Sequence, residues 1–164
     1  MQKVIPEIYP KNLIDKSRTA AFTGHRKLIY GVNTSKLKEV IKELITSGIN
    51  TFLIGMAKGF DSLCFEVLLE FKKEYDINIV AVVPCLNQTY KFTEKEKEKY
   101  EKLLSFADDK VLIRKEYTVS CMHLRNRYMV DNCSYLVAYL RENKGGTYST
   151  VKYAEKENVT IINI

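Results

Sequence analysis

The sequence predicts an α/β protein with one doubly wound, mainly parallel sheet in a single domain. Short apolar stretches typical of buried strands alternate with stretches of helical periodicity along the chain. Strands joined by helices of this length pair in parallel, because the chain must cross back over the sheet between them. The predicted strands are residues 19–23, 51–54, 77–83, 110–114, 135–139 and 160–164.

The first strand, "TAAF", consists of small or β-prone residues and suits a central position with both faces covered. After it, Leu37, Val40, Ile41 and Leu44 recur at helical spacing before Gly48, which predicts an amphipathic helix. The run "TEKEKEKYEK" alternates charge signs, as expected for a solvated helix face. The predicted helices are residues 34–47, 61–75, 93–106, 122–131 and 147–157.

The chain of 164 residues has the composition of one globular domain, with 46% hydrophobic and 28% charged residues. Residues 1–17, which contain Pro6 and Pro10, are expected to form an extended N-terminal arm, and residues 18–164 the domain. No run approaches the ~18 apolar residues of a membrane span, so we expect a cytoplasmic protein with no membrane partner.

Four widely spaced cysteines form no Cys-x-x-Cys pair, so we expect reduced thiols, no metal site and no cofactor. The net charge of +6 admits a phosphorylated or polyanionic partner without requiring one.

Three glycine-containing turns follow predicted strands: "FTGHR", "IGMAKGFD" and "ENKGGTYST". The carboxyl ends of parallel strands meet at one edge of a sheet, where helix N-termini present unpaired N–H groups to anions. Arg125 can grip a phosphate there, and we expect it rather than Arg127 to point inward. The predicted ligand-binding residues are Thr23, Gly24, His25, Arg26, Gly55, Lys58, Gly59, Asp61, Arg125, Gly145, Gly146 and Thr147.

Each of these features has a structural alternative. Thr147 or Asp61 could simply cap the helix that follows, and the glycines at 55 and 59 are weak evidence because such a spacing often reflects packing. As a functional residue, Asp61 would bind ribose hydroxyls. Glu66, further along the same predicted helix, could be an exposed residue.

Four segments together, "FTGHR", "GMAKGFD", "CMHLRNRYMVD" and "GGTYSTVKYA", resemble the SLOG superfamily, specifically its YpsA-like branch. The resemblance covers nearly the whole chain after Thr19. It implies a Rossmann-like fold that binds nucleotides or nucleotide-derived ligands. The superfamily also contains the Lonely Guy phosphoribohydrolases and DNA-processing protein A.

The Lonely Guy pattern reads Met-His-x-Arg-Lys, followed by Pro-Gly-Gly-x-Gly-Thr-x-x-Glu. Arg125 matches the arginine, with Asn126 in place of the lysine, and Gly145 and Gly146 match the paired glycines. Residues 151–152 are Val and Lys where the catalytic glutamate belongs. The comparison therefore favours binding over catalysis.

The first hypothesis is a sensor or sequestering protein for a nucleotide-derived ligand. The alternative is a nucleoside 5′-monophosphate phosphoribohydrolase, with Arg125, Asp61 and Glu66 as candidate catalytic residues. The third is a single-stranded DNA-binding protein, which needs a basic groove with exposed aromatic rings. The tyrosines considered for it are Tyr128, Tyr148 and Tyr153.

A homo-oligomer is also expected. The resemblance to SLOG proteins implies one, because these proteins are often oligomers. The predicted helix 61–75 also carries apolar residues that could bury a face against a second subunit: Val67, Leu68, Leu69 and Phe71.

Overall fold

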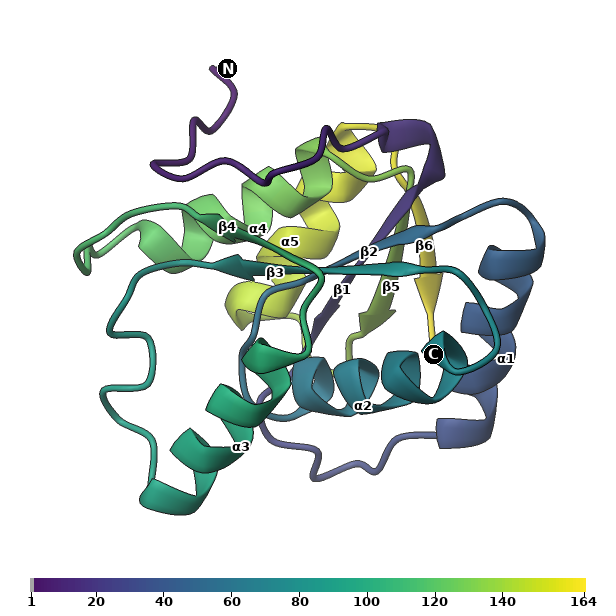
Figure 1. The fold of residues 1–164 in the computed structure, drawn as a ribbon, viewed down its shortest axis with the longest axis horizontal. Helices are drawn as coiled ribbons and strands as arrows, with labels where there is room; N and C mark the ends of the chain where they lie inside the picture. Colours follow the sequence, from purple (N-terminus) through teal and green to yellow (C-terminus); the bar gives the residue numbers. More distant parts are fainter. Residues whose placement is uncertain (1) are drawn as a thin grey trace.

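The structure, a computed structural model, describes residues 2–164; Met1 of the predicted arm lies outside the described residues. Six parallel strands form one sheet in the order β4-β3-β2-β1-β5-β6 (Figure 1). This confirms the predicted fold class. The strands are β1 (Thr19–Gly24), β2 (Thr51–Ile54), β3 (Asn78–Val83), β4 (Asp109–Leu112), β5 (Tyr135–Tyr139) and β6 (Thr160–Asn163).

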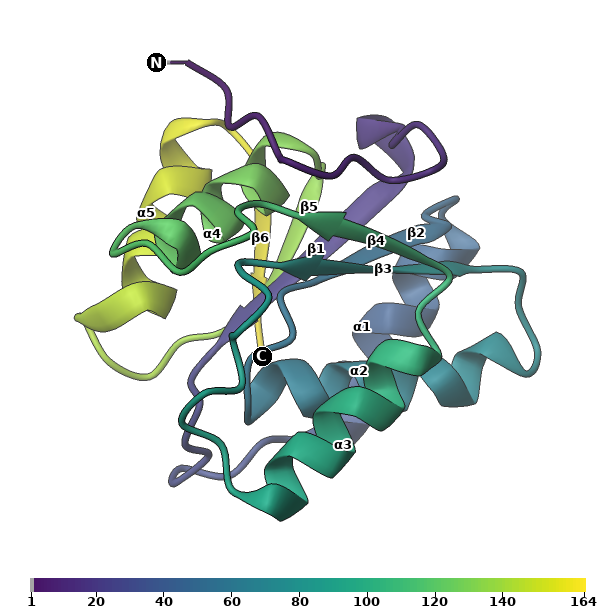
Figure 2. The ribbon, with the colours of Figure 1, turned by 60° about the vertical axis from the view of Figure 1, so that its left-hand side comes forward.

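Five α-helices cover the two faces of the sheet, and Figures 1 and 2 show α1, α2 and α3 on one face and α4 and α5 on the other. Each predicted helix is present with shifted ends: α2 stops three residues before the predicted end, and α5 starts two residues before the predicted start. The helices are α1 (Thr34–Thr46), α2 (Phe60–Lys72), α3 (Glu94–Ser105), α4 (Cys121–Asp131) and α5 (Gly145–Lys156).

Strand β1 is central and covered on both faces, as the sequence predicts. Ala20, Ala21 and Phe22 are completely buried. Because side chains alternate along a strand, Ala20 and Phe22 join the apolar cluster under α1–α3, whereas Ala21 joins the cluster under α4 and α5. The core is thus two apolar layers separated by the sheet.

The α2 residues expected to face a second subunit lie mostly within the chain's own core. Val67 and Leu68 are buried, and Leu69 and Phe71 pack partly buried against the same core cluster. Helix α2 lies between α1 and α3, which together cover these side chains. The apolar residues of this helix therefore stabilise the chain itself.

Residues of the N-terminal arm pair with the outer edge of the sheet. Ile8 and Leu112 of β4 form an isolated antiparallel bridge. The amides of Lys11 and Asn12 donate to the Asp109 carboxylate at 3.0 and 3.1 Å. The arm thus covers an edge strand that would otherwise expose unpaired backbone groups. Among residues 2–164, no helix is both long and apolar enough to cross a membrane.

Candidate functional site

The strand order reverses at β1: successive strands β2 to β4 extend to one side of it, and β5 and β6 to the other. In open α/β sheets, the loops that diverge at such a point leave a crevice where ligands bind. A pocket of about 170 Å³ lies there. We call it the switch-point pocket; it is lined by Phe22, Thr23, Gly24, His25, Arg26, Asp61, Arg125, Asn126, Met129, Gly146 and Thr147.

Most of the predicted ligand-binding residues therefore meet in one place. Eight of them line the switch-point pocket: Thr23, Gly24, His25, Arg26, Asp61, Arg125, Gly146 and Thr147. The other four, Gly55, Lys58, Gly59 and Gly145, lie beside it. Gly145 begins α5, Lys58 faces a neighbouring groove, and Gly55 and Gly59 support the pocket wall.

Gly59 brings the turn after β1 against the start of α2. Its φ of +77° belongs to the left-handed region, and a side chain there would collide with the backbone carbonyl of Arg26. The Phe60 N–H donates to the His25 carbonyl at 3.2 Å. Gly59 therefore has a packing role, and this packing aligns two walls of the pocket.

Arg125 is the inward-pointing arginine of α4, as the sequence predicts. Its side chain is buried, and its Nη1 donates to the Gly55 carbonyl, while its Nε donates to Asn126 Oδ1 at 2.8 Å. A Cβ at Gly55 would approach the Arg125 side chain to 2.9 Å, so glycine makes room for it. Arg127 lies instead over the Tyr153 ring, 5.0 Å from its centroid.

Asp61 places a buried carboxyl in the pocket. Burial raises its pKa to about 6, although nearby Arg125, the Ala57 amide and Arg26 each act to lower it. The Ala57 N–H donates to Asp61 Oδ2 at 3.1 Å. Asp61 does not cap α2, because Gly59 occupies the cap position. The pocket therefore combines two arginines with a carboxyl that titrates near neutral pH.

One ring nitrogen of His25 is already engaged within the chain. Its Nε2 accepts a hydrogen bond from the Arg141 N–H at 2.9 Å, and its ring lies edge-on to Tyr139. A nitrogen that accepts a hydrogen bond does not donate one, so donation from His25 is limited to Nδ1.

The first turn of α5 forms the opposite wall of the pocket. The helix begins at Gly145, so Thr147 lies within its first turn and is not the capping residue. The first N–H groups of a helix have no partner inside it and carry the positive end of its dipole. A Cβ placed on Gly146 would meet no described atom within 4 Å, so the space beside it is open.

Glu66 and the tyrosines considered for DNA binding lie elsewhere. Glu66 is exposed, and its Oε1 is 3.0 Å from Lys99 Nζ. Tyr128 is buried, and the Tyr153 hydroxyl donates to Asp131 at 2.7 Å. The Tyr148 ring lies 5.4 Å from Lys152 Nζ. The direction of these side chains depends on how their helices pack, which their spacing in the sequence does not show.

A second hollow of about 460 Å³ adjoins the switch-point pocket, since Arg26 lines both. Among its lining residues, Arg26 and Lys58 are predicted ligand-binding residues. Met122 lies in α4, within the segment "CMHLRNRYMVD", and the others follow β3 and β4 in loops without a recognisable motif, so no sequence signal marks those loop residues. We call it the aromatic groove; it is lined by Arg26, Lys58, Asn87, Gln88, Tyr90, Lys91, Phe92, Tyr117 and Met122.

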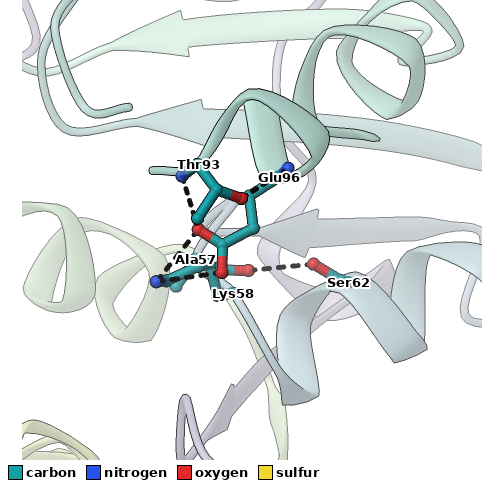
Figure 3. Close-up of polar contacts among 5 residues, drawn as sticks. All are labelled: Ala57, Lys58, Ser62, Thr93 and Glu96. Carbon is teal, nitrogen blue, oxygen red and sulfur yellow. Dashed lines mark hydrogen bonds and ion pairs between the residues drawn. The ribbon is translucent and has the colours of Figure 1, made fainter. Parts of the chain in front are cut away.

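Polar contacts hold Lys58, on one wall of this groove, against the start of α3 (Figure 3). Lys58 Nζ lies 3.3 Å from Glu96 Oε2, and the same carboxylate accepts from the Thr93 N–H. On the other side, Ser62 Oγ donates to the Ala57 carbonyl at 3.3 Å. The loop between β2 and α2 is therefore tied to two helices.

Gln88 fixes the same loop from within. Its side-chain amide donates to the carbonyls of Gly55 and Met56 at 3.2 and 3.1 Å, and its Oε1 accepts from the Tyr100 hydroxyl. Gln88 could not be predicted as a buried residue, because a glutamine in a loop is usually exposed.

A parallel, doubly wound sheet with a crevice at its switch point defines a Rossmann-like fold. The YpsA family model, described as the YspA SLOG family, matches residues 21–164. The chain belongs to this family, as its motifs indicate.

Two relatives come from Bacillus. The chain is 30% identical over 135 residues to the SPbeta prophage-derived protein YoqJ of Bacillus subtilis strain 168, covering 74% of this chain and 79% of YoqJ. It is 25% identical over 159 residues to a UPF0398 protein of Bacillus thuringiensis strain Al Hakam, covering 89% and 86%.

Among solved structures, the fold is similar to two examples of DNA processing protein A. The Streptococcus pneumoniae protein matches with a TM-score of 0.67 and 16% identity, over 89% of this chain and 50% of that one. The Helicobacter pylori protein, described with a single-stranded DNA binding mode, matches with a TM-score of 0.64 and 15% identity. That match covers 87% of this chain and 63% of the H. pylori chain, so both neighbours extend well beyond it.

Proposed function

We propose that this protein binds a nucleotide or nucleotide-derived ligand, as a sensor or sequestering protein, with the ligand phosphate in the switch-point pocket. One observation carries the proposal: Arg26, Arg125 and the first turn of α5 converge on the same pocket. Arginine side chains and helix N-termini are both favourable partners for phosphate.

The shape of the α5 turn supports the same proposal. Open space beside Gly146 lets a phosphate oxygen approach the backbone N–H groups directly. Asp61 is the single acidic residue among the described residues that line the pocket. With a pKa of about 6, it is partly protonated near neutral pH and then repels an anion less.

Calorimetric titration with AMP, ADP-ribose and cyclic dinucleotides tests the proposal. Arg125→Ala should weaken the bound ligand by about 1.5–3 kcal/mol, the contribution of a hydrogen bond to a charged group, and the loss should shrink at high salt. Gly146→Val should abolish binding at an unchanged melting temperature, because the new side chain fills the open space without meeting described atoms.

Arg127→Ala is the matched control on the same helix, since Arg127 lies over Tyr153 and outside the pocket. If Arg125→Ala and Gly146→Val stay folded and keep the affinity of the unaltered chain, the pocket is not the site. Chromatography of the same mixtures for free base separates plain binding from the phosphoribohydrolase reaction, for which Asp61 would be the carboxylate in the pocket.

Single-stranded DNA binding is the second candidate. The aromatic groove supports it, because cationic side chains alternate there with Tyr90 and Tyr117, which are 77% and 59% exposed. The ssDNA binding mode described for the H. pylori neighbour also favours it. Titration with phosphorylated oligothymidylates of 4 to 16 nucleotides should then show affinity that rises with length and falls steeply with salt.

A further inference from the structure

The switch-point pocket is too small for a whole nucleotide. Its volume of about 170 Å³ lies below the roughly 300–1,000 Å³ typical of small-molecule sites. Its lining is rich in polar groups suited to a phosphate, among them Arg26, Arg125 and Thr147. A ligand held by its phosphate must therefore extend its remaining part into a neighbouring hollow.

Two hollows adjoin the pocket, and their charges differ. A cavity of about 320 Å³ between α2 and α3 shares Asp61 with it, but Glu66 and Glu96 also line that cavity, against Lys99 alone. Glu66 pairs with Lys99 and Glu96 with Lys58, yet the lining still carries three acidic groups against one cation, which disfavours an anionic ligand. Among the described residues that line the aromatic groove, none is acidic, and Arg26, Lys58 and Lys91 are cationic. Charge therefore directs the ligand toward the groove.

The groove also offers flat apolar surface. Tyr90 and Tyr117 are mostly exposed to solvent, whereas Phe92 has one face under Lys58 Nζ, 5.1 Å from the ring centroid, and its ring in a T-shaped contact with Tyr100. Tyr90 and Tyr117 are thus the rings available for stacking. Aromatic side chains stack on the faces of nucleobases, and the side-chain amide of Asn87 can both donate to and accept from a base edge.

We propose that the ligand carries a nucleobase, which the aromatic groove holds against Tyr90 and Tyr117 while the phosphate lies in the switch-point pocket. This inference rests on the proposed function. A groove of about 460 Å³ suits one small ligand, whereas non-specific single-strand binding engages about 4–16 nucleotides. The ligand class is therefore a mononucleotide or a derivative of one, rather than a sugar phosphate or a nucleic acid strand.

The test compares ribose 5-phosphate, which has no base, with AMP and UMP by calorimetry. At least one of the two nucleotides should bind roughly 5- to 150-fold more tightly than ribose 5-phosphate, the range for one stacked base. The double variant Tyr90→Leu with Tyr117→Leu should remove this advantage and leave ribose 5-phosphate affinity unchanged. The matched double variant with Phe at both positions keeps the rings and should retain the advantage.

The outcomes separate this inference from the proposed function. Equal affinity for all three probes, or a Leu double variant that keeps the advantage of the nucleotides, overturns the base site. If the probes bind equally and Gly146→Val abolishes their binding, the phosphate site still stands. If none of the three probes binds, the mononucleotide inference falls, and the proposed function falls with it only if ADP-ribose and cyclic dinucleotides also fail to bind. If a phosphorylated octathymidylate binds far more tightly than AMP and UMP, with a steep salt dependence, the groove serves a nucleic acid strand and the mononucleotide inference is overturned. Melting temperatures of the exposed-tyrosine variants should equal that of the unaltered chain.

Discussion

At the scale of single residues, Asp61 and Arg125 show how burial changes chemistry. Both side chains are buried beside the switch-point pocket. Burial lowers the pKa of the Arg125 guanidinium, which nevertheless stays charged at neutral pH, and raises the pKa of Asp61 to about 6. The net charge of the pocket therefore changes around pH 6 through Asp61.

Asp61 makes folding stability depend on pH. Its pKa is raised from about 3.8 to about 6 in the folded chain, so ionisation favours the unfolded state as pH rises from 4 to 6. The cost above pH 6 is about 3 kcal/mol at 1.36 kcal/mol per pH unit. We expect Asp61→Asn, which keeps an oxygen for the Ala57 amide, to gain stability relative to the unaltered chain across this range. Thermal melts between pH 4 and 7.5 check this, and parallel pH profiles would contradict it.

At the scale of elements, the start of α3 combines a helix cap with a contact to another loop. Thr93 Oγ1 accepts from the Glu96 N–H at 3.2 Å, and Glu96 Oε2 accepts from the Thr93 N–H at 2.9 Å, which is a capping box. Glu96 also pairs with Lys58. The Thr93 amide, more than Lys58, holds the pKa of Glu96 below its ordinary value.

Two substitutions separate these roles. Thr93→Ala should lower the free energy of unfolding by about 0.5–2 kcal/mol, because the cap is lost. Glu96→Gln should cost less, since glutamine can still accept from the Thr93 amide and only an exposed ion pair disappears. Its cost should vanish in acid, because a depressed pKa stabilises the fold only while the carboxylate is ionised. Urea unfolding at pH 7 and pH 3 measures both; a larger loss for Glu96→Gln would mean that the Lys58 contact dominates.

At the scale of the whole molecule, the arm protects the edge of the sheet. Deleting residues 2–13 removes the Ile8 bridge and the amides that bind Asp109. Unpaired edge strands associate with other chains, so we expect a lower melting temperature and self-association that increases with concentration. Nucleotide affinity should be unchanged, because none of these residues lines the switch-point pocket or the aromatic groove.

Scanning fluorimetry and sedimentation velocity check this prediction. Asp109→Asn is the milder variant, since it keeps the arm but removes the charge that its amides bind. Burial raises the pKa of Asp109, yet the amides of Lys11, Asn12 and Lys110 outweigh that effect and hold the pKa below its usual value. A shortened chain that melts like the full chain and sediments as the same species would show that the arm is dispensable.

The sequence by itself determined the order and type of the elements, because strand and helix periodicities are local properties of the chain. It also determined that the turns after β1, β2 and β5 share one edge, since every strand is parallel. Only the tertiary structure decided that the α2 residues Val67 and Leu68 are buried, because their cover comes from helices distant in sequence. It likewise assembled Tyr90 and Tyr117 into a groove: they lie in separate loops without a motif, and only the pairing of β3 with β4 brings those loops together.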